Sequence, residues 1–259
     1  MPINDDLRKE IKRDLVGRIE KKIKNYDFSN KSGNPFIDIV FGKFSNIKSF
    51  IHGTATMLGG YYEILARKIA KDNPIFVEAK KFVFTGEISN SESVVIKNLV
   101  KDLEEKKIDS RYEDEIKEIY SAETKILRGT RITIDLFLKE KSGKEHFIEM
   151  KEPDPNKEEV RAAKEDLLNI VAMKKRDMNL KDFYKNVTIV FGVYYNNKEE
   201  DYNNWKVSPM FEKGKGILVQ KEFWDLLGGE GTYSDLLSIL EEVREEVAPL
   251  IEDVMKNKF

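Results

Sequence analysis

Apolar residues recur at helical spacing over the first third of the chain. Between residues 4 and 25 a leucine or isoleucine stands at every fourth position among charged residues, which predicts an amphipathic helix. Residues 26–36 are rich in Ser, Asn, Gly and Pro and predict a loop. A second helix is predicted over residues 47–71. Residues 1–72 are therefore expected to form a mainly helical portion.

The pattern then changes to strands that alternate with helices. Residues 74–87 and 216–220 predict strands, and residues 187–194 are apolar on both faces, as in a buried central strand. Residues 91–127 predict charged, solvent-exposed helix, and residues 232–255 predict a last amphipathic helix. This order predicts an α/β fold with a mixed central sheet flanked by helices.

The organising stretch of the chain lies between Arg131 and Lys174. It predicts a strand, a tight turn, a second strand and a long helix. Glu149 and Lys151 stand two apart on the second strand and so project from one face. Asp135, on the first strand, has apolar neighbours, and a buried acid is costly unless it is paired or bound to a metal.

The register of this hairpin decides whether the two acids meet. A two-residue loop over 142–143 would set Asp135 opposite Met150, on the wrong face. A three-residue loop over 142–144 would set Asp135 opposite Lys151, on the same face as the second acid. A metal site requires the longer loop or a bulge with the same effect, and the sequence leaves both registers open.

This arrangement fits phosphodiester hydrolysis. Asp135 and Glu149 would bind Mg²⁺, with waters filling its other positions. Lys151 would orient or deprotonate the attacking water and offset charge on the phosphorus. The alternative is a purely structural Asp–Lys pair across the hairpin. Glu78 and Lys80 form a rival pair with the same spacing, but no acid precedes them on a paired strand.

Polar and basic residues after the second strand are candidate DNA contacts. Asn156 is a good N-cap for the following helix, with Glu159 at its third position. A basic stripe on that helix would hold phosphates, although a solvated helix face is an equally good interpretation. The candidates are Asn156, Lys157, Arg161, Lys164, Asn196 and Asn197.

Composition narrows the classes of function. The chain has 259 residues, 36% of them charged, with a formal net charge of -2, so nucleic-acid binding must rely on local basic patches. The absence of Cys excludes thiolate catalysis and disulfides, and two His leave little for histidine chemistry. No apolar run is long enough for a membrane span. The N-terminal residues lack the apolar core of a signal peptide, so a cytoplasmic location is expected. Abundant Lys and Glu favour a thermophile, or an AT-rich genome.

At Asp135 and at Glu149-Met150-Lys151 the chain resembles the PD-(D/E)xK nuclease superfamily. Glu63 resembles the additional acidic residue of that superfamily, whereas Ile134 stands where its proline would be. MKEPDPNK, VFGVYYNN and EFWDLLGG look like Type II restriction endonucleases, most of all the TdeIII-like group that cuts GGNCC.

The resemblance implies one restriction-endonuclease-like domain over residues 1–259, with residues 74–259 holding the catalytic core and the C-terminal helix. It also implies Mg²⁺ as cofactor, a homodimer on palindromic double-stranded DNA, and a cognate methyltransferase that protects the same site. Two alternatives stay open: a repair or junction nuclease with the same catalytic residues but no base specificity, and a non-enzymatic scaffold protein.

Overall fold

The computed structural model describes residues 3–26, 45–198 and 201–258. The chain forms two compact units, one of Met1–Leu65 with Gly228–Phe259 and one of Ala66–Leu227. A loop is predicted over residues 26–36, and of these only Tyr26 is among the described residues. That residues 1–259 make one domain stays a prediction.

The first unit is helical. It contains α1 (Asp5–Asn25), most of α3 (Ser45–Asp72) and α9 (Thr232–Lys258), which confirms the three helices predicted there. α1 and α9 run in the same direction, because Ile3 N donates to Asp235 Oδ2 (2.9 Å) and Lys12 pairs with Glu246 (3.2 Å). Both helices bury apolar side chains: Leu7, Ile11, Leu15, Leu236, Ile239 and Val243.

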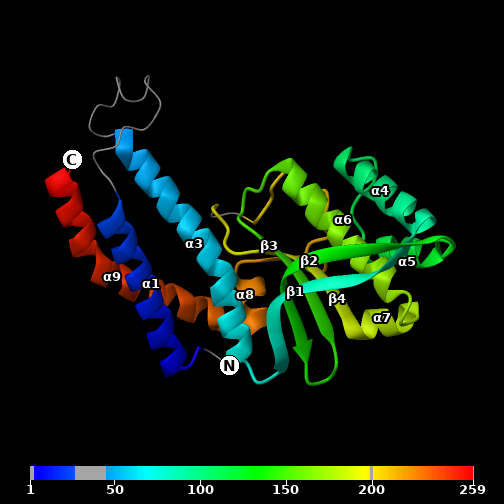
Figure 1. Ribbon diagram of the computed structural model, residues 1–259, viewed down its shortest axis with the longest axis horizontal. Helices are drawn as coiled ribbons and strands as arrows, with labels where there is room; N and C mark the ends of the chain where they lie inside the picture. The colour runs from blue at the N-terminus through cyan, green and yellow to red at the C-terminus, as the bar shows by residue number, and fades with distance from the viewer. Residues whose placement is uncertain (1–2, 27–44, 199–200, 259) are drawn as a thin grey trace. The chain divides into compact units, whose positions relative to one another are not determined.

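The second unit is built on a five-stranded mixed sheet (Figure 1). Its strands lie side by side in chain order: β1 (Phe76–Ser89), β2 (Leu127–Glu140), β3 (Glu145–Lys151), β4 (Val187–Val193) and β5 (Ile217–Val219). β1 pairs with β2 and β2 with β3 in antiparallel fashion, whereas β3 pairs with β4 and β4 with β5 in parallel fashion. The predicted α/β class with a mixed sheet is confirmed.

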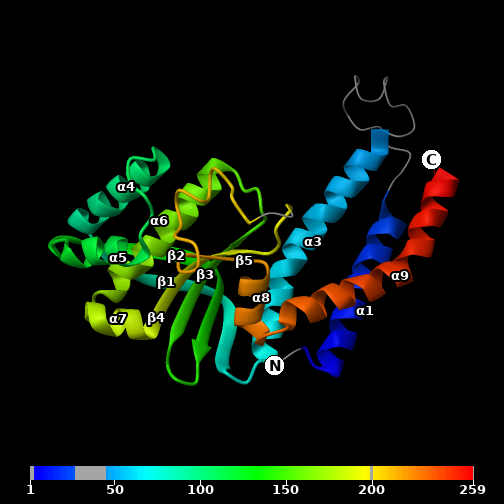
Figure 2. The same ribbon diagram turned by 180° about the vertical axis from the view of Figure 1, so that it is seen from behind.

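Helices cover both faces of this sheet (Figure 2). On one face α6 packs against the sheet with α4 and α5 beside it, and on the other Phe223 of α8 contacts Gly192 of β4. The single helical region predicted over residues 91–127 is two helices, with Lys106 between them in the left-handed region (φ 56°). The helices are α4 (Asn90–Glu104), α5 (Tyr112–Ser121), α6 (Lys157–Lys174), α7 (Leu180–Asn186) and α8 (Lys221–Gly228).

α6 begins as its sequence predicts. Asn156 accepts from Glu159 N (2.8 Å) and Glu159 accepts from Asn156 N (3.0 Å), so both cap each other's backbone donors. An apolar stripe of α6, which includes Val160 and Leu167, is buried against the sheet. The capping box fixes the start of α6 shortly after Lys151.

The β2–β3 hairpin takes neither of the two predicted registers. Glu140 N donates to Lys144 O (2.8 Å), so the loop has the expected three residues but spans 141–143, with Gly143 at φ 91°. Leu136 pairs with Ile148, and the same register continued by one residue sets Asp135 against Glu149. The two acids therefore share a face, as the metal-site hypothesis requires.

Candidate active site

Asp135, Glu149 and Lys151 lie together on the second unit. Lys151 Nζ is 3.5 Å from Asp135 Oδ2 and 3.5 Å from Glu149 Oε2. Asp135 Oδ2 also accepts a hydrogen bond from Met150 N (3.1 Å), which ties the acid to the backbone of β3. Lys151 is the last residue of β3, so this cluster lies where the parallel strands β3 and β4 end.

A β-bulge positions Asp135. Lys80 pairs with Phe137 and Phe82 with Ile134, so two residues of β2, Asp135 and Leu136, stand opposite Lys81. Such bulges redirect side chains and are frequent beside active sites. Lys81 Nζ lies 3.7 Å from Asp135 Oδ1, and its side chain is 52% exposed. Lys81 thus adds a second cation beside this carboxylate.

The cluster is mostly withdrawn from water. The side chains of Asp135 and Glu149 are 14% and 8% exposed, and that of Lys151 is 26% exposed. Burial raises the pKa of Glu149 to about 8, and the neighbouring Asp135 charge raises it as well. Burial lowers the pKa of Lys151, but the two carboxylates outweigh it and raise that pKa above its ordinary value.

The rival pair has a different environment. Lys80 Nζ contacts Glu78 Oε2 at 2.6 Å, and both side chains are 40% or more exposed. The hydrogen bond from Lys80 lowers the pKa of Glu78, so this acid is an ordinary surface carboxylate. No second acid is paired with it in the ion pairs of the described chain.

Sequence comparisons show the family. The sequence model described as "Type II restriction endonuclease, HinfI" matches residues 3–244, nearly the whole chain. The chain belongs to this family of Type II restriction endonucleases. The match includes every residue of the cluster around Lys151.

Three curated relatives from Herpetosiphon aurantiacus are Type II restriction enzymes. HgiCII is 27% identical over 265 residues, covering 94% of this chain and 95% of the relative. HgiBI is 24% identical over 76% of this chain and 72% of the relative. HgiEI is 29% identical over 46% of this chain and 43% of its own length. No solved structure matches this restriction endonuclease.

The donor set of the cluster fits Mg²⁺. Mg²⁺ prefers oxygen ligands and is often held by one or two carboxylates together with waters and substrate phosphates. Asp135 and Glu149 supply two such carboxylates around one ammonium group. Among the described residues, no group of three or more His, Asp and Glu side chains is placed to hold a metal ion. The protein's share of a site here would be these two acids.

The basic stripe predicted on α6 divides into two exposed residues and one buried residue. Lys157 and Arg161 have side chains 49% and 53% exposed, and pair with Glu104 (2.8 Å) and Glu165 (3.2 Å). Lys164 is buried, and its Nζ lies 2.5 Å from Glu115 Oε2. Because this buried pair holds the ammonium group inside the protein, we leave Lys164 out of the candidate DNA contacts.

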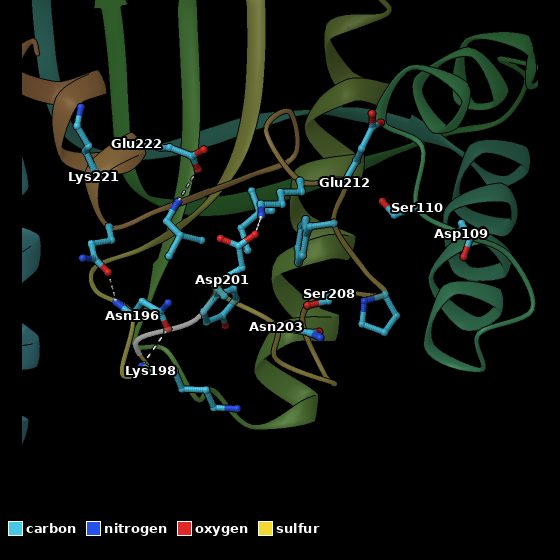
Figure 3. A pocket seen from close by; sticks show the side chains of 17 residues that line it. Asp109, Ser110, Asn196, Lys198, Asp201, Asn203, Ser208, Glu212, Lys221 and Glu222 are labelled. Atoms are coloured by element: carbon cyan, nitrogen blue, oxygen red, sulfur yellow. Dashed lines mark hydrogen bonds and ion pairs between the residues drawn. The ribbon is translucent and has the colours of Figure 1, made fainter.

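The three predicted asparagines lie on exposed or partly exposed turns. Asn156 uses its side chain to cap α6, and Asn197 is exposed. Asn196 accepts from Lys198 N (3.2 Å) and donates its own N–H to Gln220 Oε1 (2.9 Å). Asn196 lines a hollow of about 860 Å³ between the loop after β4 and the start of α8 (Figure 3). This hollow is lined by both acidic and basic side chains and by none of the three clustered residues.

Two further acids bear on the candidate site: Glu63, which the sequence predicts as a catalytic residue, and Asp166, which lies on α6. Glu63 lies in the part of α3 that belongs to the first unit, and its share in catalysis stays a prediction. Asp166 of α6, whose charge raises the pKa of Glu149, is not among the predicted site residues. Burial raises the pKa of Asp166 itself. Its helical spacing from buried Ala163 and Ile170 is the signal that could have found it.

Proposed function

We propose that this chain is a Mg²⁺-dependent endonuclease that cuts both strands of DNA at a short palindromic site. The observation that carries the proposal is the placement of Asp135 and Glu149 at 3.5 Å from one ammonium group, that of Lys151. This arrangement, in a chain of a restriction endonuclease family, supports the proposal of a PD-(D/E)xK nuclease site.

Each residue of the cluster has a proposed role. Asp135 and Glu149 would hold the metal ion. Because both side chains are mostly buried, bulk water has little access to their carboxylates. Bound there, Mg²⁺ would polarise the scissile phosphate and lower the pKa of the attacking water. Lys151 would orient or deprotonate that water and offset negative charge that develops on the phosphate. The sequence resemblance alone makes Glu63 a further candidate acid.

The proposal extends to a wider biological role, which membership of the family supports. A homodimer would cut a palindrome with one site per strand, and a cognate methyltransferase would protect the host genome in the cytoplasm. GGNCC is the proposed target. Arg and Lys are the side chains that pair best with guanine O6 and N7, which makes Lys157 and Arg161 the basic candidates for contacts near such a target. Among the described residues, no helix is long and apolar enough to cross a membrane.

Digestion of plasmid DNA tests the proposal. The purified protein with Mg²⁺ should give sharp fragments whose mapped ends share one palindrome, and chelation of Mg²⁺ should stop the cutting. A smear without common ends would favour a repair or junction nuclease. Intact plasmid under all conditions of salt and temperature would contradict nuclease activity altogether.

A further inference from the structure

Trp205 is the large aromatic side chain that most clearly lacks a structural role. It lies in the turn after the loop that follows β4, and 64% of its surface is exposed. The second tryptophan of the chain, Trp224, is 1% exposed and donates its indole N–H to Tyr194 O (2.7 Å). Because exposing an indole is costly, its position indicates a surface that is covered during function.

Cations surround this indole. Trp205 lines a hollow of about 90 Å³ together with Lys106, Lys157, Arg161 and Lys206. Among the described residues that line it, the carboxylate comes from Glu104 alone. On a chain with a net charge of -2, four cations that line one hollow beside a single acid form the kind of local basic patch that binding to a polyanion needs.

The ion pairs of Lys157 and Arg161 leave these two cations available, whereas Lys206 is only 15% exposed and is held by Asp154. The side chains of Lys157 and Arg161 are 49% and 53% exposed, and those of their partners Glu104 and Glu165 are 22% and 29% exposed. Ion pairs that are open to solvent in this way contribute little to stability. Lys106 is exposed at the end of α4. Phosphates can therefore replace the present partners at little cost.

Hydrogen bonds and an ion pair connect the segment that holds Trp205 to the residues that follow β3. Tyr202 donates its hydroxyl to Pro153 O (2.8 Å), and Asn204 Nδ2 donates to the same oxygen (3.1 Å). Lys206 Nζ lies 2.6 Å from Asp154 Oδ1. Pro153 and Asp154 follow Lys151 closely in the chain, so DNA held on the patch would lie next to the proposed site of cutting.

We infer that Trp205, Lys106, Lys157 and Arg161 form a contact site for duplex DNA, with Lys206 holding the segment of Trp205 in place through Asp154. The cations pair with backbone phosphates, and the indole packs on a sugar or on an unstacked base. The inference rests on the proposed function and extends it, because it adds Trp205 and Lys106 to the candidate contacts.

Tryptophan fluorescence tests this site directly. A labelled duplex containing GGNCC is titrated without Mg²⁺, so that binding is measured without cutting. DNA should quench Trp205 emission and shield it from iodide, and Trp205→Phe should remove that change because Trp224 is buried. Trp205→Ala should weaken binding about tenfold, the size of one lost stacking contact, with no change in salt dependence.

Charge variants separate stacking from phosphate contact. Lys106→Asn should reduce the slope of log affinity against log salt by about one, and Asn tolerates the left-handed backbone at this position. Lys185→Ala is the matched control, an exposed lysine of α7 beyond the far end of α6, and should leave the slope unchanged.

Three results would overturn the inference. If the protein binds and cuts DNA while Trp205 emission and the affinity of Trp205→Ala stay unchanged, the contact site is elsewhere and the proposed function stands. If the indole becomes shielded with rising protein concentration alone, a second copy of the chain covers it. If no duplex is bound or cut, the proposed function fails with it.

Discussion

At the scale of single residues, Glu149 is a candidate catalytic acid whose ionised form is disfavoured by burial and by the neighbouring Asp135 charge. It shares a mostly buried space with Asp135, and Lys151 is the cation within 3.5 Å of both. Glu149→Gln should abolish cutting while leaving the metal-free protein about as stable as wild type at pH 7, because a pKa of about 8 keeps the Glu149 carboxyl mostly protonated there and Gln resembles that neutral form.

Metal addition makes this expectation measurable. Mg²⁺ should raise the melting temperature of wild type, since a ligand that binds only the folded state stabilises it, and should not raise that of Glu149→Gln. Glu78→Gln is the matched control on an exposed E-x-K pair and should respond to Mg²⁺ as wild type does. An equal Mg²⁺ response in Glu149→Gln would remove Glu149 from the metal site.

Lys164 is a second residue whose environment gives a specific expectation. Its ammonium contacts Glu115 Oε2 (2.5 Å), and burial lowers the pKa of Lys164. Lys164→Met should cost about 3–5 kcal/mol of unfolding free energy, because the Glu115 charge would stay buried without its partner. Denaturant unfolding should show much of that loss recovered in the double variant with Glu115→Gln. A neutral Lys164→Met would mean that the lysine is exposed in solution.

At the scale of elements, packing of α8 on β4 depends on a residue without a side chain. A Cβ on Gly192 would lie 2.7 Å from two ring carbons of Phe223 and 3.2 Å from Ile148 Cγ2. Gly192→Ala should therefore destabilise the protein by about 1–3 kcal/mol, and Phe223→Leu in the same chain should restore part of it. Gly129→Ala on β2, where nothing lies within 4 Å, should be close to neutral in the same thermal melts.

Elements with local signals could be predicted from the sequence. The start of α6 follows from Asn156 and Glu159, because a capping box involves only neighbouring residues. The shared face of Glu149 and Lys151 follows from strand alternation alone. The short helix α7 was missed, because it has few residues and buries only Phe183.

Features that depend on distant partners could not be predicted. The bulge at Asp135 exists only through pairing of β2 with β1, and the hairpin loop begins one residue earlier than either predicted loop. Lys164 matched the spacing of a surface stripe, but its partner Glu115 lies on α5, 49 residues away in the chain. Burial and pairing of this kind require the fold.

At the scale of the whole molecule, the implied homodimer makes a prediction about strand cutting. Mixed dimers of wild type and Lys151→Ala, isolated with two different tags, should nick one strand of the palindrome, because each subunit acts on one strand. Gel analysis of supercoiled plasmid should show open circles as the main product. Linear plasmid formed at the wild-type rate would contradict one site per strand.

The most direct test of the account is the rate of DNA cutting by Lys151→Ala measured beside Lys80→Ala, with folding of both checked by thermal melts. Both lysines stand two residues after a glutamate on a strand, but only Lys151 lies between two mostly buried carboxylates. Lys151→Ala should lose about 10²–10⁴-fold in the single-turnover rate, and Lys80→Ala should cut as wild type does. Normal cutting by a folded Lys151→Ala would contradict the proposed active site.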